Sequence, residues 1–297
     1  MRVIIPEPIT DQNLISSNVP ENDAPDYSSG ATYGAGEAVM LDHVVYQAAA
    51  DGVSGVDPKT DDGTSWIPLG STRRWRPFDG VIADPVTVTS STLVYRFAPQ
   101  SLARGVALFG LVADRVDVTV SHGENSVVFR KELISFDHID GWWSWLFVEP
   151  TREAECVFLD LPWFGAGTEI EVKVISHSGN VAAGQIVMGD VQRVGQTRWG
   201  AEIGLLSSSR KERDQYGRWV IVKRYTSRTA RLPVMVRGKS PRAVQKMFAA
   251  LDALPAVFVG DERGEFGLIL FGLYLEYNTT LAGDGWSEVM IYVESIQ

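Results

Sequence analysis

Four aromatic residues in one short segment are the side chains of this sequence best suited to binding a molecule outside the protein. Tyr27, Tyr33, Tyr46 and Trp66 lie among Gly and Pro residues between positions 27 and 69. A segment this short cannot bury much apolar surface alone. Tyr and Trp rings have a large face of negative potential, and such faces stack on the axial C–H groups of sugar rings. The segment is therefore a candidate ligand-contact surface.

The order of these residues resembles that of the small three-stranded chitin- and cellulose-binding modules of secreted glycosidases. In those modules an aromatic residue, a Y-x-x-G-x-x-V strand, a V-Y-x-A strand and a closing Trp follow one another, as Tyr27, residues 33–39, residues 45–48 and Trp66 do here. The resemblance implies a carbohydrate-binding module with Tyr27 and Trp66 as its stacking platform and with Tyr33 and Tyr46 in its inner packing. The alternative is that Trp66 is the plug of a tiny core, because so small a domain needs one to fold.

Residue types that are typical of catalysis are scattered along the sequence. The four histidines are not at metal-ligand spacing, no G-x-S-x-G elbow or P-loop is present, and Cys156 lies in an apolar run that predicts a buried thiol. The Asp137-His138-Ile139-Asp140 stretch could do acid–base chemistry, although a polar loop is the simpler interpretation. We expect no enzyme activity, no metal and no cofactor; carboxylates that meet only in space, as in glycoside hydrolysis, are the open alternative.

Three of the nine tryptophans lie close together in residues 141–147. If this segment is a strand, Trp143 and Trp145 face one side and Trp142 faces the other. That pattern predicts a sandwich core with one exposed ring. The alternative is a second surface for a sugar or a protein partner.

The net charge of −10 is unevenly distributed. Residues 1–80 and 81–181 carry net charges of −7 and −6, whereas residues 182–297 carry +3. The positive charge is concentrated between residues 209 and 247, where basic side chains alternate with apolar ones along predicted strands. This pattern favours docking onto an acidic partner or a neighbouring subunit over a nucleic-acid patch, because no nucleic-acid-binding motif accompanies it. The predicted interface residues are Arg210, Lys211, Arg213, Arg218, Lys223, Arg224, Arg228, Arg231 and Arg237.

Hydrophobic periodicity divides the chain into four parts and predicts a mainly β protein. Residues 1–26 are rich in Pro and polar side chains and are typical of an extended arm, and residues 27–72 form the aromatic module. Residues 73–181 alternate with period two, which predicts a jelly-roll-like β-sandwich. Residues 182–297 predict a β-rich docking domain with one packed helix near residues 241–254. Ser240 is its predicted N-cap, and Val244, Phe248 and Leu251 lie at helical spacing.

No hydrophobic signal region or membrane-spanning apolar run is found, and the single cysteine is compatible with synthesis in a reducing cytoplasm. Carbohydrate recognition in such a chain is unusual for a cell protein and normal for a virus particle that assembles inside its host.

Motifs along the whole chain resemble a family of tailed-bacteriophage tail or minor tail proteins. They include residues 4–10, 74–80, 145–150, 159–162, 209–217 and 254–260. The resemblance implies a structural subunit of a tail tip or baseplate in the virion, assembled in the host cytoplasm. A distal-tail-like ring subunit would be a homo-oligomer that contacts copies of itself, other tail proteins and cell-surface glycan. The alternatives are a receptor-binding tail fibre or fibre adaptor, and a tail-associated glycan hydrolase.

Overall fold

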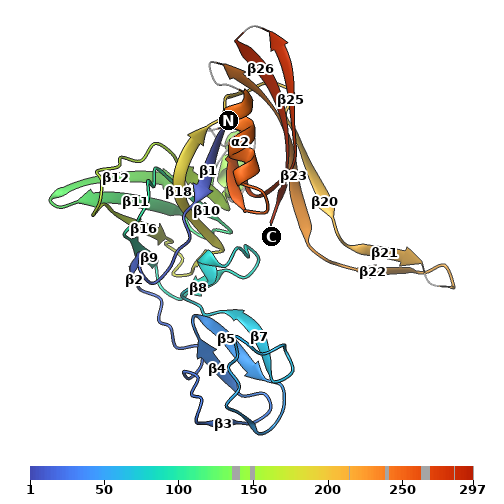
Figure 1. The fold of residues 1–297 in the computed structure, drawn as a ribbon. Helices are drawn as coiled ribbons and strands as arrows, with labels where there is room; N and C mark the ends of the chain where they lie inside the picture. The colour runs from blue at the N-terminus through green and yellow to red at the C-terminus, as the bar shows by residue number, and fades with distance from the viewer. Residues whose placement is uncertain are drawn as a thin grey trace.

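The computed structural model describes residues 1–135, 141–147, 151–213, 215–237, 241–261, 268–283 and 285–296. Within these residues the fold is mainly β, with two short α-helices and one 3-10 turn, η1 (Arg76–Phe78). The chain forms a small module, a β-sandwich, and a curled sheet from which a two-stranded ribbon projects (Figure 1). The prediction of a mainly β protein with one packed helix in its last third is confirmed.

The sandwich packs a five-stranded sheet against one end of a ten-stranded sheet, and the two inner faces share one hydrophobic core. Apolar and polar residues alternate along strands of the five-stranded sheet. In one of them, Ile170, Val172 and Val174 are fully buried, while Glu169 and Glu171 point outward. Its strands, in spatial order, are β12 (Asn125–Glu132), β11 (Arg115–His122), β16 (Glu169–Ile175), β9 (Thr92–Phe97) and β2 (Leu14–Ser17).

The ten-stranded sheet runs from the sandwich into the last third of the chain. Its order is β15 (Glu155–Phe158), β10 (Gly105–Phe109), β18 (Gln185–Arg193), β1 (Arg2–Pro6), β24 (Ala256–Val259), β25 (Ile269–Gly283), β26 (Trp286–Ser295), β23 (Thr226–Arg237) and β19 (Gln196–Thr197), with β20 (Glu202–Ser207) also paired to β23. β10 is buried along its whole length because it has a core on both faces. Val106 and Leu108 pack in the sandwich, and Ala107 and Phe109 pack in a second core.

The first residues of the chain are not an extended arm, contrary to the prediction for residues 1–26. β1 pairs with β18 on one side and with β24 on the other, and Val3 and Ile4 are fully buried in two different cores. The predicted division at residue 181 is also wrong. β18 pairs with β10 in the sandwich layer and with β1 beyond it, so one sheet unites the two predicted domains.

Helix α2 (Pro241–Ala250) covers the last strands of the large sheet, as Figure 1 shows. Val244, Phe248 and Leu251 are buried, which confirms the predicted apolar face. The helix is shorter than predicted, and Leu254 is exposed. The predicted N-cap, Ser240, lies outside the described residues.

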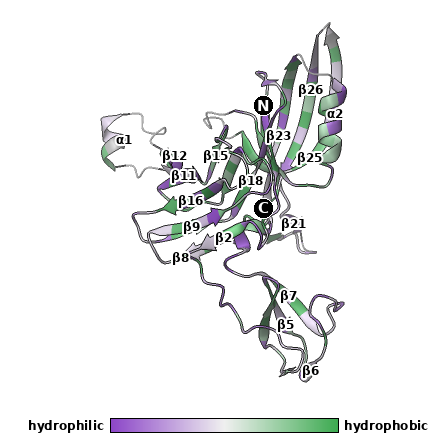
Figure 2. Ribbon diagram, turned by 60° about the vertical axis from the view of Figure 1, so that its left-hand side comes forward, coloured by the Kyte–Doolittle hydropathy of each residue, from purple (hydrophilic) through white to green (hydrophobic). Residues whose placement is uncertain are grey.

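Helix α1 (Trp142–Phe147) replaces the strand that the tryptophan pattern predicted, and that prediction is wrong. Trp142 and Trp143 are both exposed, so they are not sandwich-core residues. The rings of Trp143 and Phe147 are 4.5 Å apart, the contact that helical i, i+4 spacing allows and a strand does not. Figure 2 shows α1 at the outer edge of the molecule. The side chain of Trp145 lies outside the described residues.

The remaining strands form small sheets. The module holds a three-stranded sheet of β4 (Ala38–Leu41), β5 (Val44–Ala48) and β7 (Trp66–Ser71), beside a pair of β3 (Thr32–Tyr33) and β6 (Val53–Ser54). Other pairs are β8 (Val86–Val88) with β17 (Val181–Ala183), β13 (Ile134–Ser135) with β14 (Thr151–Arg152), and β21 (Arg210–Arg213) with β22 (Trp219–Val222). No helix among the described residues is long and apolar enough to cross a membrane.

Candidate functional site: the aromatic module and the basic ribbon

Trp66 is the plug of the module core and not an exposed platform. Its side chain is 1% exposed, and it packs with Val39, Tyr46 and Val53. Its indole Nε1 donates a hydrogen bond to the carbonyl oxygen of Val56, at 3.0 Å. The expected role of Trp66 in stacking on a sugar is therefore wrong for this conformation, because neither face of the ring reaches the surface.

The carboxylate of Asp61 fixes the chain that carries Trp66. It accepts hydrogen bonds from the backbone N–H groups of Gly63, Ser65 and Trp66. Donation by Trp66 first, and then by the other two groups, lowers the pKa of Asp61 below its ordinary value. The loop before β7 is thus held by a charged side chain that accepts three backbone donors.

Tyr27 and Tyr33 are the two predicted sugar-binding residues that keep part of their surface exposed. Their rings stack with centroids 6.0 Å apart, and each ring is in a T-shaped arrangement with the Trp66 ring. The Tyr27 hydroxyl donates to the carbonyl oxygen of Val56, and burial, together with the charge of Asp57, raises its pKa. Tyr46 is buried, as the resemblance implied, whereas Tyr33 belongs to the half-buried pair.

A ribbon, defined here as residues 202–229, projects from the large sheet (Figure 1). Its base is β20 paired with the first part of β23, and its outer part is β21 paired with β22. Every residue of β21 and β22 is exposed, including large apolar side chains. Leu205, Trp219 and Ile221 are 74%, 59% and 66% exposed.

The outer part of the ribbon has apolar and basic side chains on both faces. The register places Arg210 opposite Val222 and Arg213 opposite Trp219, and the Arg213 guanidinium lies 4.7 Å from the centre of the Trp219 ring. An isolated two-stranded hairpin is marginally stable in water. A ribbon with this composition is therefore suited to being covered by another molecule.

The structure places the nine predicted interface residues in different parts of the fold. Those exposed along the outer ribbon are Arg210, Lys211, Arg213, Arg218, Lys223 and Arg224. Arg228, in contrast, is partly buried and lies 2.6 Å from Glu155 of β15, so its charge is paired within the chain. Arg231 pairs with Glu202 at the base of the ribbon, and Arg237 is exposed at the far end of β23.

Cys156 is fully buried, as predicted, and burial raises the pKa of its thiol to about 12. Such a thiol is not a nucleophile at neutral pH. Within the described residues, no group of three or more His, Cys, Asp or Glu side chains could hold a metal ion. The Asp137, His138 and Asp140 candidates lie outside these residues.

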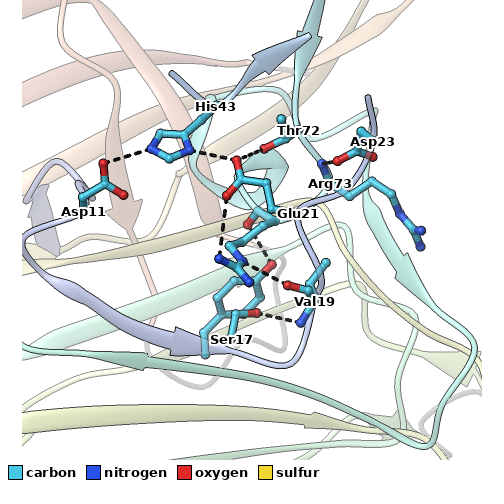
Figure 3. Close-up of polar contacts among 10 residues, drawn as sticks. Asp11, Ser17, Val19, Glu21, Asp23, His43, Thr72 and Arg73 are labelled. Atoms are coloured by element: carbon cyan, nitrogen blue, oxygen red, sulfur yellow. Dashed lines mark hydrogen bonds and ion pairs between the residues drawn. The ribbon is translucent and has the colours of Figure 1, made fainter. Parts of the chain in front are cut away.

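A polar cluster at the junction between module and sandwich was missed by sequence reasoning (Figure 3). Glu21 accepts hydrogen bonds from His43 Nδ1 and from Thr72 Oγ1, both at 2.8 Å. His43 Nε2 lies 3.1 Å from a carboxylate oxygen of Asp11. These residues are 61 positions apart in sequence from first to last, so no local motif could have indicated that they meet.

No protein-family model, no curated protein and no solved structure matches this chain.

Proposed function

We propose that this protein is a non-enzymatic structural subunit of a bacteriophage tail tip or baseplate, which assembles through the ribbon and presents the module to cell-surface glycan. The observation that carries the proposal is the ribbon, a projecting pair of strands with exposed Trp219, Ile221 and Leu205 among basic side chains. Large exposed apolar side chains next to Arg are typical of protein–protein interfaces.

The proposed partner of the ribbon is the acidic surface of a second copy of the chain. Residues 1–80 and 81–181 carry net charges of −7 and −6, and within residues 27–72 six carboxylates accompany a single Lys or Arg residue, Lys59. Complementary charges of this kind set the orientation of two partners, while each exposed ion pair contributes only about 0–1 kcal/mol. Because the ribbon and the acidic surface are different patches, the contact is heterologous and builds a ring or a filament.

The proposal that the chain belongs to a phage tail rests on the sequence resemblance. The projection of the module supports its proposed role in attachment to a host. Residues 27–72 extend away from the sheets that carry the ribbon (Figure 1), so one part of the chain is available for assembly and another for contact with a host. The second candidate function is a receptor-binding fibre or fibre adaptor, which the same projection of the module favours. It differs from a tail-tip or baseplate subunit in its position on the particle.

Charge reversal on the ribbon tests the proposed interface. Lys211 and Lys223 are exposed, so we predict that the Lys211→Glu/Lys223→Glu variant folds normally and has a lower oligomeric mass than the wild-type protein. The measurement is multi-angle light scattering after size-exclusion chromatography at low ionic strength. Added salt should weaken the wild-type oligomer, because exposed charges are screened.

The matched control is Arg242→Glu/Lys246→Glu on the exposed face of α2, which changes the charge by the same amount outside the ribbon. We expect this variant to assemble as the wild-type protein does. Equal masses for the ribbon variant and the wild-type protein, or equal loss of assembly in both variants, would contradict ribbon-mediated assembly.

A further inference from the structure

The junction between module and sandwich contains a histidine whose two ring nitrogens both face carboxylates. Nδ1 of His43 is 2.8 Å from Glu21, and Nε2 is 3.1 Å from Asp11. A neutral imidazole has only one N–H group, so it can donate to only one of two such acceptors. An imidazolium can donate to both. The positions of the heavy atoms therefore match the protonated form.

The two carboxylates belong to parts of the chain outside the module. Asp11 lies in a turn that is attached to the sandwich, because the Ala98 N–H donates to the carbonyl oxygen of Asn13 at 2.7 Å and β2 pairs with β9. Glu21 lies in the segment that leads from β2 into the module, and it also accepts from Thr72 Oγ1 where the chain leaves the module. His43 therefore links the module to both connecting segments and to the sandwich.

The His43 ring also stacks on Trp75, with centroids 4.0 Å apart and an angle of 25° between the planes. Trp75 is buried and contacts Phe78, which in turn packs against Tyr95 in the sandwich core. A protonated imidazole gains a cation–π attraction from this indole face, and the neutral ring does not. Loss of the proton thus weakens the stacking as well as one of the two hydrogen bonds.

The backbone at His43 supports a role for its side chain. Asp42 and His43 are the central residues of the two-residue turn between β4 and β5, with φ values of 46° and 67°. Such turns favour Asn-Gly, because both central residues must adopt positive φ. A histidine at the position where Gly or Asn is favoured is strained, and its polar contacts across the junction give a reason for its presence.

We propose that His43 is a pH-dependent latch, which holds the module against the sandwich while its ring is protonated and lets the module move when the proton is lost. Besides Asp11 and Glu21, the charged groups near this ring are Arg74, whose Nη1 lies 3.7 Å from Glu21, and Asp42, which is paired with Lys59. The latch is independent of the ribbon, so its test does not depend on the proposed assembly.

The pKa shifts define the pH range in which the latch is closed. Partial burial alone would lower the pKa of His43, but its hydrogen bonds to Glu21 and Asp11 outweigh burial and raise it above 6.5. Burial would raise the pKa of Glu21, but hydrogen bonds from His43 and Thr72 lower it below 4.5. The His43 contribution is complete below its unfolded pKa and is lost as pH rises through the raised folded pKa. The Glu21 contribution is lost only when pH falls through its own lowered value.

Single-molecule energy transfer between module and sandwich tests the latch. Dyes on Ala50→Cys and Glu124→Cys report the separation, since both sites are exposed and the native Cys156 is buried. From about pH 5 to about pH 9, across the histidine titration, the wild-type distribution should change from narrow to broad, with a midpoint above the ordinary histidine pKa. His43→Asn tolerates the positive-φ backbone, and it should give the broad distribution at every pH.

The matched control is His177→Asn, which removes an imidazole whose Nδ1 contacts Asp114 in the sandwich. In this variant the distance distribution should change with pH as it does in the wild-type protein. If His43→Asn does not fold by circular dichroism, Asp11→Asn removes the opposite partner from an exposed site and should shift the midpoint to lower pH. A distribution that is independent of pH in the wild-type protein, or a midpoint unchanged by the variants at His43 and Asp11, would overturn the latch.

Discussion

At the scale of single residues, the module is organised around one buried indole. Trp66 touches the rings of both Tyr27 and Tyr33 and donates to the carbonyl oxygen of Val56. The two tyrosines therefore owe their orientation to a residue that does not itself reach the surface. A ligand that contacts this site would meet the half-buried tyrosine pair, and Trp66 would act by positioning that pair.

Substitutions at Trp66 and Tyr33 separate these roles. Trp66→Ala should lower the free energy of unfolding of the module by about 3–5 kcal/mol, as for other buried aromatic residues, measured by denaturant titration. Tyr33→Ala should leave the module folded and reduce retention on insoluble chitin or cellulose. Retention of the folded Tyr33→Ala variant at the wild-type level would show that the tyrosine pair does not bind these glycans.

The sequence pattern identified four aromatic residues that the fold brings together, but not which of their rings are exposed. The strand order around Tyr46 and the closing Trp66 follows from local motifs, whereas exposure depends on how the loop held by Asp61 folds over the core. His43 carried no sequence signal, because its partners Asp11 and Glu21 approach it only in the folded chain.

At the scale of elements, α2 is the part of the fold that periodicity predicted best. Pro241 at its start and apolar residues at helical spacing determine both the helix and its buried face. The α1 segment was mispredicted because three closely spaced tryptophans fit strand alternation and a helical turn equally well over so few residues. Exposure of Trp142 and Trp143 could not be read from composition.

The packing of α2 predicts that shortening the buried Phe248 side chain strongly lowers the stability of the fold. Phe248 is 1% exposed and contacts the rings of Tyr274 and Tyr277 on β25. Phe248→Ala should therefore lower the free energy of unfolding by roughly 3–5 kcal/mol, measured by chemical denaturation. Gln245→Ala, at an exposed position of the same helix, should have little effect. Equal stability of the two variants would contradict the observed packing.

At the scale of the whole molecule, one continuous sheet connects parts of the chain that the sequence pattern divides. β1 lies between β18 and β24, so the first residues of the chain complete the sheet of the last third. Strand alternation indicates that residues 2–6 can be buried, but pairing over such distances depends on tertiary contacts. The uneven distribution of charge along the chain is evident from the sequence itself. The structure adds that six of the basic residues lie exposed along the outer part of the ribbon, whereas Arg228 at its base pairs with Glu155.

The central proposal is that this chain belongs to the tail tip or baseplate of a phage particle, and labelling the chain in that particle tests it most directly. A gold-labelled antibody against the module, which projects from the rest of the chain, would locate the protein by electron microscopy. We predict label at the tip of the tail in a repeated, symmetric arrangement. Label confined to the head, or particles that contain none of this chain, would contradict the proposal.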